Sequence, residues 1–441
     1  MDTGFPLVML TLPLVAAAVG VVLRSRRRAT AVAGVVTAAL LTLLLWLAAP
    51  EEGLFADNSA TFYGREIVLT PYIRSLFLFI YPAFGLLAAT SWFRPLGRMV
   101  VPSGLAALSP LAAALMVSPM AFGVVWLVVT AAVLTPALYS GRYEAASSTW
   151  RYFLLTALSV VPLLLTASPP SGGWNMPWLA SLLAVRVVLG GFPFHLWVAE
   201  LGRRSSPAAL ALVLGLAQIV PVVFVFSLLD TVPAARAAVE FQTAVRWSAA
   251  LTALLAVFQM SRSRDWRGIV TGATLLDMGF LLAAALAPGA DGLIIAVPAL
   301  INRYLSLLML VLGGESERAA DNDSRIGRFG RRLRPLLFAY GLFSLIGLPL
   351  TPGFAARWAQ VSVVGQASGI WPSILLVASL LAAAWIAARS IGRSREGQEE
   401  QPGGRSEGET VFAAIMFGVL VLLGWLPHLL SEYAARMLGI L

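Results

Sequence analysis

Seven polar side chains interrupt stretches of this sequence that are otherwise apolar and long enough to cross a membrane. They comprise three arginines, a histidine, two carboxylates and an amide: Arg186, His195, Glu200, Gln218, Asp277, Arg303 and Arg357. Because a charged side chain is costly at membrane depth, such residues usually mark an ion pathway or an internal ion pair. These seven are therefore the candidate ion-path residues.

The three arginines have two interpretations, and all three are expected in or at the break of a helix. They either supply fixed positive charge that steers ions or water along a file at mid-membrane depth, or they pair with a carboxylate or cap carbonyls freed at the break. We favour the second role for Arg186 and Arg303, and weigh the two equally for Arg357. The candidate counter-charges are the carboxylates expected at depth: Glu200, Asp277 and Asp230.

The histidine and the glutamine also have two interpretations each. An unperturbed imidazole has a pKa of about 6.5, so His195 suits proton transfer. Its neighbours Pro193 and Trp197 favour instead a structural role, in which the ring holds a broken helix by hydrogen bonds. Gln218 either lines a water file or satisfies the carbonyl that Pro221 leaves without a donor.

Two of the apolar segments that carry these residues are interrupted by glycine and proline. The interruptions of segments 176–202 and 335–369 lie at Gly190, Gly191 and Pro193, and at Pro349, Pro352 and Gly353. Irregular backbone survives in hydrocarbon only where protein or water satisfies its polar groups, so broken helices point to a binding or conduction site. The two segments lie five crossings apart, which predicts inverted repeats of five helices each.

Composition places the chain in a membrane. Of its 441 residues, 59% are hydrophobic and 12% are charged, about half the charged fraction of a soluble domain. All 31 basic residues are arginines that stand beside apolar runs. There they orient the chain in a bilayer, so the formal charge of +9 does not indicate nucleic-acid binding.

The residue inventory also limits the cofactors. The sequence has no cysteine, which excludes disulfides, iron–sulfur clusters and thiolate metal sites in this chain. Two histidines, His195 and His428, are too few to favour a haem held by paired histidines. We expect no cofactor in this chain.

The apolar runs predict an all-α polytopic protein with about 14 crossings of ~20 residues each. The runs are 5–23, 30–48, 74–92, 100–117, 120–139, 148–167, 176–202, 207–229, 243–259, 268–287, 291–313, 335–369, 371–389 and 411–429. Arginine-rich loops alternate with arginine-poor ones, which predicts both termini on the outer face of a bacterial plasma membrane. The polar stretches 314–334 and 390–410 are expected to be loops.

Four parts follow from these runs. We expect peripheral N-terminal helices in 1–99, a first repeat in 100–229, a second, inverted repeat in 243–389, and a C-terminal helix in 411–441.

Five blocks of sequence stand in a fixed order between residues 100 and 390. They are Trp126 through Arg151-Tyr152-Phe153-Leu154-Leu155; Pro193-Phe194-His195-x-Trp197; Asp265-Trp266-Arg267 through Met278-Gly279-Phe280; Ile301-Asn302-Arg303 through Gly313-Gly314; and Gly347-Leu348-Pro349 with Gly353-Phe354 and Arg357. Together they resemble the antiporter-like membrane subunits of respiratory complex I (NADH:quinone oxidoreductase), membrane-bound hydrogenases and multi-subunit cation/proton antiporters. The resemblance implies 14 helices with a discontinuous seventh and twelfth, and transport of protons or monovalent cations within a complex of membrane subunits.

Most titratable residues of that family's proton path have no counterpart here. The corresponding positions hold apolar, amide or guanidinium groups: Leu127, Val188, Gln218, Leu307 and Arg357. Asp277 stands where the family often has His or Gln. A proton relay needs groups whose pKa lies near the working pH, and these replacements do not provide them.

We therefore expect a membrane subunit of a complex I-like, proton-translocating assembly that pumps weakly or not at all. At most it is a non-catalytic subunit of an NADH:quinone oxidoreductase. The alternatives are a purely structural scaffold subunit, or a subunit of a cation/proton antiporter or ion-coupled uptake assembly without a redox partner. The expected partners are other membrane subunits, the lipid bilayer, and protons or monovalent cations.

Overall fold

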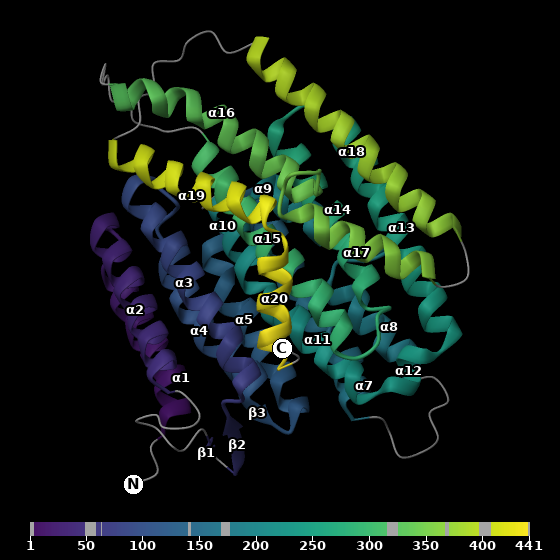
Figure 1. Cartoon of the computed structure of the whole chain (residues 1–441). Helices are drawn as coiled ribbons and strands as arrows, with labels where there is room; N and C mark the ends of the chain where they lie inside the picture. Colours follow the sequence, from purple (N-terminus) through teal and green to yellow (C-terminus); the bar gives the residue numbers. More distant parts are fainter. Residues whose placement is uncertain are drawn as a thin grey trace. The chain divides into compact units, whose positions relative to one another are not determined.

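The computed structural model describes residues 4–48, 59–62, 64–139, 143–168, 177–314, 325–366, 370–396 and 407–439, and most of these are helical (Figure 1). Within them, eleven helices are long and apolar enough to span a membrane. Two shorter apolar helices, Val100–Met116 and Pro177–Val188, add to these. The all-α polytopic fold is confirmed, whereas the count of 14 crossings stays a prediction.

The chain divides into two compact units, of which the first comprises residues 1–188, 204–241 and 435–441. Its helices are α1 (Phe5–Val22), α2 (Arg27–Leu47), α3 (Pro71–Phe93), α4 (Val100–Met116), α5 (Gly123–Leu138), α6 (Tyr143–Leu158), α7 (Val160–Ala167), α8 (Pro177–Val188), α10 (Pro207–Leu210), α11 (Ile219–Thr231) and α12 (Pro233–Ala237). α2 packs along α3, and α4 packs against both α1 and α5. Nearly every residue of α4 is buried, which makes it the centre of this unit.

The second unit comprises residues 189–203 and 242–434. It contains all or most of α9 (Leu196–Arg204), α13 (Val239–Arg262), α14 (Trp266–Ala284), α15 (Ala290–Gly313), α16 (Arg325–Ile346), α17 (Gly353–Gln366), α18 (Ile370–Glu396), α19 (Glu407–Trp425) and α20 (His428–Met437). α15 packs against α16 and α17, and α14 contacts all three of them. These four helices position the buried charges described below. The four-part division into repeats stays a prediction.

Ser-Pro and Thr-Pro pairs set the starts of two membrane helices. Thr70 accepts a hydrogen bond at its side chain from the Ile73 amide (3.3 Å), and Pro71 opens α3. Ser206 accepts in the same way from the Ala209 amide (3.2 Å), and Pro207 opens α10. A hydroxyl N-cap followed by proline is a strong start signal because it satisfies one orphan donor and removes another.

The discontinuities expected in 176–202 and 335–369 are both present. The first separates α8 from α9 and contains Gly190, whose φ of 59° lies in the left-handed region. Gly191 and Pro193 lie in the same break. The Phe192 amide donates to the Thr252 hydroxyl at 2.9 Å, which ties this irregular backbone to α13.

The second discontinuity separates α16 from α17. Gly347 and Leu350 have φ values of 93° and 67° there, Pro349 and Pro352 lie between the helices, and Gly353 is the first residue of α17. A left-handed residue stops a helix without disorder, which is why glycine is favoured at such positions.

The span predicted for 207–229 is not a regular helix. Residues Ala211–Ala217 form a π-helix between α10 and α11, and all seven are buried. Gln218 is the residue that directly follows this π-helix. π-Turns within α-helices are rare and are common at functional sites.

Three local predictions were wrong or incomplete. The stretch 314–334 is not all loop, because α16 begins at Arg325, and 390–410 is shortened because α18 continues to Glu396. Residues 315–324 and 397–406 lie outside the described part of the chain. The run 148–167 is interrupted at Ser159, between α6 and α7.

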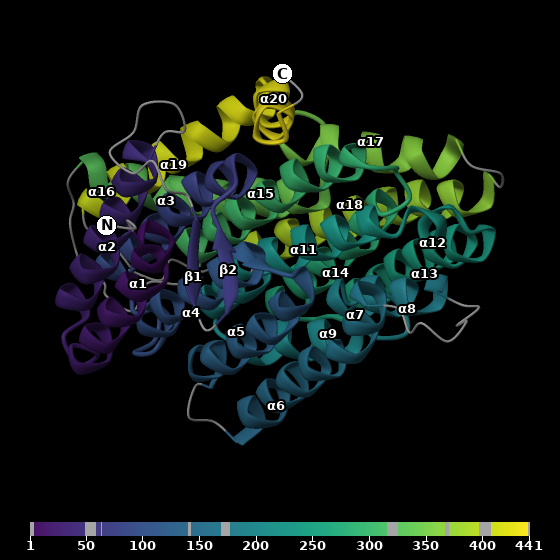
Figure 2. The same ribbon diagram turned by 90° about the horizontal axis from the view of Figure 1, so that it is seen from below.

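A small antiparallel sheet was not predicted. β1 (Ser59–Phe62) pairs with β2 (Arg65–Val68), and these two strands lie side by side in Figure 2. β2 also pairs with β3 (Val117–Ser118), and all three strands lie within the first unit.

Candidate ion-pair site in the second unit

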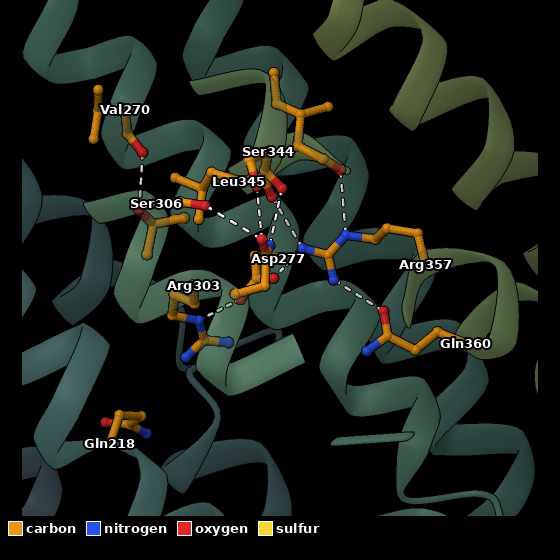
Figure 3. A network of polar contacts seen from close by, with 12 residues as sticks. Gln218, Val270, Asp277, Arg303, Ser306, Ser344, Leu345, Arg357 and Gln360 are labelled. Carbon is orange, nitrogen blue, oxygen red and sulfur yellow. Dashed lines mark hydrogen bonds and ion pairs between the residues drawn. The ribbon is translucent and has the colours of Figure 1, made fainter. Parts of the chain in front are cut away.

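Asp277 lies in α14 and is wholly removed from solvent, with an exposed fraction of 0%. One of its carboxylate oxygens accepts a hydrogen bond from Arg303 Nε, and the other accepts from Arg357 Nη2 (Figure 3). Both contacts are also ion pairs. A single carboxylate therefore joins α14 to α15 and to the second half of the broken span.

Arg357 makes further contacts that hold the break in place. Its Nε donates to the Ile346 carbonyl at 3.2 Å, and its Nη2 donates to the Leu345 carbonyl at 3.0 Å. These carbonyls belong to the last turn of α16, where the backbone has no further turn to supply donors. Its Nη1 donates to Gln360 Oε1 at 2.9 Å. The guanidinium thus both caps the broken helix and pairs with Asp277.

Arg303 is bound on one side only. Its exposed fraction is 0%, and its Nη1 and Nη2 have no hydrogen-bond partner among the described residues. The cluster of Asp277, Arg303 and Arg357 carries one formal positive charge in excess. Removing a charge from water is costly unless it is paired and hydrogen-bonded, so the excess positive charge destabilises the site.

A second polar contact joins the helices beside the cluster. Asn302 Nδ2 donates to the Ser344 carbonyl at 2.9 Å, and Asn302 Oδ1 accepts from the Ser344 hydroxyl at 2.6 Å. Ser306 also donates to Asn302 Oδ1, at 3.5 Å. All three side chains are fully buried, so this contact fixes α15 against α16 next to Arg303.

The break fits closely around Arg357. A Cβ on Gly347 would overlap Arg357 Cγ, and a Cβ on Gly353 would overlap the Ser344 carbonyl oxygen. Glycine is therefore required at Gly347 for two reasons, its positive φ and the contact with Arg357.

The arrangement suits fixed charge better than proton transfer. Arginine does not give up its proton in a protein, so neither guanidinium can act as a base. Both oxygens of Asp277 are already bound by cations. Within the described residues, no group of His, Cys, Asp or Glu is placed to hold a metal ion.

The pairing role favoured for Arg303 agrees with its ion pair to Asp277. Its expected place at a break is wrong, because Arg303 lies in the uninterrupted helix α15. Arg357 lies five residues into α17 and combines pairing with capping. Arg186 lies two residues before the end of α8 and is half-buried.

The amide of Gln218 satisfies a broken-helix carbonyl, but not the one expected. Its Nε2 donates to the Val188 carbonyl at 2.5 Å, rather than to the carbonyl freed by Pro221. Val188 is the last residue of α8, so its carbonyl lacks a donor within the helix. Gln218 is buried, with an exposed fraction of 6%.

His195 and Glu200 lie in the second unit, at and after the first break. The His195 ring stacks on Phe192, with ring centroids 6.1 Å apart. Its carbonyl accepts from the Val198 amide (3.1 Å) and so starts α9. Both side chains are half-buried.

Asn302, Ser344 and Gln360 were not among the predicted site residues, although all three contact the cluster or its neighbours. Each is a polar residue within a buried helix, with an exposed fraction of 0%. A polar residue within an otherwise apolar helix is the sequence feature that could have identified these three as site residues.

Comparison with known proteins agrees with this architecture. Residues 167–382 match a family profile described as "NADH:quinone oxidoreductase/Mrp antiporter, TM". An NADH-quinone oxidoreductase subunit N of Neisseria gonorrhoeae is 24% identical over 331 residues, which cover 67% of each chain. Three further NADH-quinone oxidoreductase subunits N are matched over only 38–40% of their length.

Two solved structures share the fold over almost the whole chain. A chain of the Mrp complex from a Dietzia species has a TM-score of 0.73 at 16% identity and covers 99% of this chain and 97% of that one. A chain of respiratory complex I from Thermus thermophilus has a TM-score of 0.72 at 19% identity, with 97% and 99% covered.

A bundle of membrane-spanning helices with two broken spans and buried charge beside a break defines the class of antiporter-like membrane subunits. Over residues 167–382 the chain is similar to the family shared by NADH:quinone oxidoreductases and Mrp antiporters, and it is an integral membrane protein.

Proposed function

We propose that this chain is a membrane subunit of a complex I-like, proton-translocating assembly, and that its Arg303–Asp277–Arg357 cluster holds charge in place instead of passing protons. The single observation that carries the proposal is the double pairing of Asp277. Two guanidinium groups occupy its two oxygens, and neither guanidinium releases a proton. The subunit then pumps weakly or not at all.

The residues at the other expected path positions support the same proposal. Leu127, Val188 and Leu307 are buried, with exposed fractions of 4%, 8% and 2%. Apolar side chains at these positions cannot accept or donate a proton. Gln218 is engaged with the Val188 carbonyl and is not a titratable group.

Membership of an oxidoreductase assembly is supported by the similarity to NADH-quinone oxidoreductase subunits N. We propose accordingly that the partners are other membrane subunits, that this chain binds no redox cofactor, and that it lies in a bacterial plasma membrane with both termini outside. A scaffold role without any conduction is the limiting case of the same proposal.

A cation/proton antiporter subunit is the second candidate. The match to the Mrp complex, with a TM-score of 0.73, is as good as the match to complex I. The fold alone therefore does not separate an assembly with a redox partner from one without.

Purification of the assembly from native membranes through a tag on this chain tests the proposal. We expect copurified subunits that oxidise NADH with reduction of a quinone. A stable assembly that exchanges sodium for protons in vesicles and oxidises no NADH would overturn the proposal in favour of the antiporter.

A further inference from the structure

The second unit has a pocket of about 430 Å³ at one end of its helices. Its walls come from the first turns of α13, the link between α14 and α15, the first turns of α15, and the last turns of α17. Because α13, α14 and α15 are membrane-spanning helices, their ends mark the boundary between hydrocarbon and water. The pocket therefore lies at the depth of lipid head groups.

A basic side chain forms the inner polar part of this pocket. Arg246 lies two turns into α13 and is 6% exposed. Its Nη2 donates to Gln242 Oε1 at 2.9 Å, and Gln242 stands one turn nearer the start of the helix. The side chain thus points along α13 toward the membrane boundary, as long basic side chains near helix ends do.

An acidic side chain lines the same pocket from another helix. Asp291 lies in the first turn of α15 and is exposed. The pocket thus presents a cation at its inner part and an anion at its open part. Gln242 and Gln366 also line the pocket, and the apolar part of its wall includes Leu286, Ile295 and Val363.

We propose that this pocket binds the head group of phosphatidylethanolamine, a zwitterionic phospholipid. Arg246 receives the phosphate, Asp291 receives the primary ammonium, and the apolar wall contacts the glycerol and the start of the acyl chains. The volume lies within the range of about 300–1,000 Å³ that is usual for small-ligand pockets. A phosphate bound by arginine and an ammonium bound by a carboxylate are both charge-assisted hydrogen bonds.

The two charges predict a preference among phospholipids. Phosphatidylglycerol has no cation for Asp291, whose carboxylate repels it. Phosphatidylcholine carries a quaternary ammonium with no N–H to donate, so it loses the hydrogen bond to Asp291. Phosphatidylethanolamine alone of these three satisfies both charged side chains.

Native mass spectrometry of the full-length chain released from nanodiscs tests this proposal. The nanodiscs contain equal amounts of phosphatidylethanolamine, phosphatidylglycerol and phosphatidylcholine with identical acyl chains. We expect the wild type to retain phosphatidylethanolamine about tenfold over the other two, which corresponds to one lost charge-assisted contact. Equal retention of the three lipids, or preferential retention of phosphatidylglycerol, would overturn the proposal.

Matched variants locate the site. Asp291→Asn, at an exposed position, should abolish the preference for phosphatidylethanolamine, whereas Arg246→Gln should lower retention of all three lipids. Glu240→Gln and Arg262→Gln are the controls, because both residues are exposed on α13 and do not line the pocket. Loss of the preference in the controls, or its persistence in Asp291→Asn, would overturn the assignment.

A further arm separates the lipid from its soluble head group. Free O-phosphoethanolamine is added to the chain in detergent without phospholipid. Weak or absent retention supports the lipid, because the apolar wall then contributes to binding. Retention as strong as that of the lipid, with the same dependence on Asp291, would show that the soluble zwitterion is the ligand and would overturn the lipid assignment.

Discussion

Asp277 of α14 and Arg357 of α17 form an ion pair between residues that stand 80 positions apart, and both side chains are buried. The same guanidinium binds the last carbonyls of α16, so the charge pair and the helix break are one structure. This link explains how an arginine is tolerated at membrane depth: its donors are used by a carboxylate, two carbonyls and the Gln360 amide oxygen.

Asp277→Asn should destabilise the protein strongly. The change leaves two buried guanidinium groups without their counter-charge, and breaking a buried pair from one side typically costs about 3–5 kcal/mol. Unfolding of the purified chain in detergent measures the loss. Asp265→Asn, at the N-cap position directly before the same helix, is the matched control, because Asp265 is exposed and makes no side-chain cap, and its effect should stay within about 0.5 kcal/mol.

The charge balance has a second consequence that the same assay measures. Asp277→Asn combined with Arg303→Gln removes one positive charge together with the negative one, so the double variant should recover part of the stability lost in Asp277→Asn. Additive losses would show that Arg303 and Asp277 are not coupled and would contradict the observed ion pair.

Gly347→Ala should also destabilise, by about 1–3 kcal/mol, because an L-residue is strained at positive φ and the added Cβ meets Arg357. Gly418→Ala in α19 is the control: a Cβ there has open space, and alanine is the better helix former by about 1 kcal/mol. In thermal unfolding, the melting temperature should fall in Gly347→Ala and rise in Gly418→Ala. An unchanged melting temperature in Gly347→Ala would contradict the tight fit of the break around Arg357.

Gln218→Leu should cost about 1–3 kcal/mol, because it leaves the buried Val188 carbonyl without a donor. The comparison variant is Gln259→Leu. Gln259 Nε2 is buried and has no hydrogen-bond partner among the described residues, so its replacement should be neutral or stabilising. Equal losses in the two leucine variants would argue that Gln218 does not support the end of α8.

The proposed orientation predicts a labelling pattern. The natural chain has no cysteine, so single cysteines report without background. A membrane-impermeant maleimide added to intact cells should label Ala290→Cys, in a predicted outer link, and should not label Ser25→Cys, in a predicted inner one. The reverse pattern would place both termini inside.

The sequence predicted the membrane helices and their breaks because hydropathy, glycine and proline act locally. It did not predict the partner of Gln218, because the Val188 carbonyl lies 30 residues away and depends on helix packing. The π-helix at 211–217 also left no trace, because a uniformly apolar run looks the same at any helical period. The start of α16 was missed because its first turns are rich in arginine and resemble a polar loop.

Asp277 and Arg303 were both predicted site residues. Only the fold shows that the Asp277 carboxylate lies between two arginines, one of which is Arg303. Sequence reasoning placed Arg303 in or at the break of a helix, where it would pair with a carboxylate or cap carbonyls. The structure puts it in a continuous helix, where Asp277 accepts the one hydrogen bond that its guanidinium donates among the described residues. The rotation of α15 about its own axis decides which neighbour Arg303 contacts. That rotation cannot be predicted from the sequence, because an almost wholly apolar helix has no polar face to show which side is buried.

The central claim is that the cluster fixes charge and does not relay protons. Proton uptake per NADH oxidised, measured in liposomes that contain the purified assembly, tests it most directly. The variant is Asp277→Asn combined with Arg357→Gln, which keeps the net charge of the cluster and retains side-chain donors near the Leu345 and Ile346 carbonyls. Our account predicts the wild-type number of protons per NADH in every assembly that remains intact. A clear fall in that number at unchanged NADH oxidation would contradict it and show that protons pass through Asp277 and Arg357.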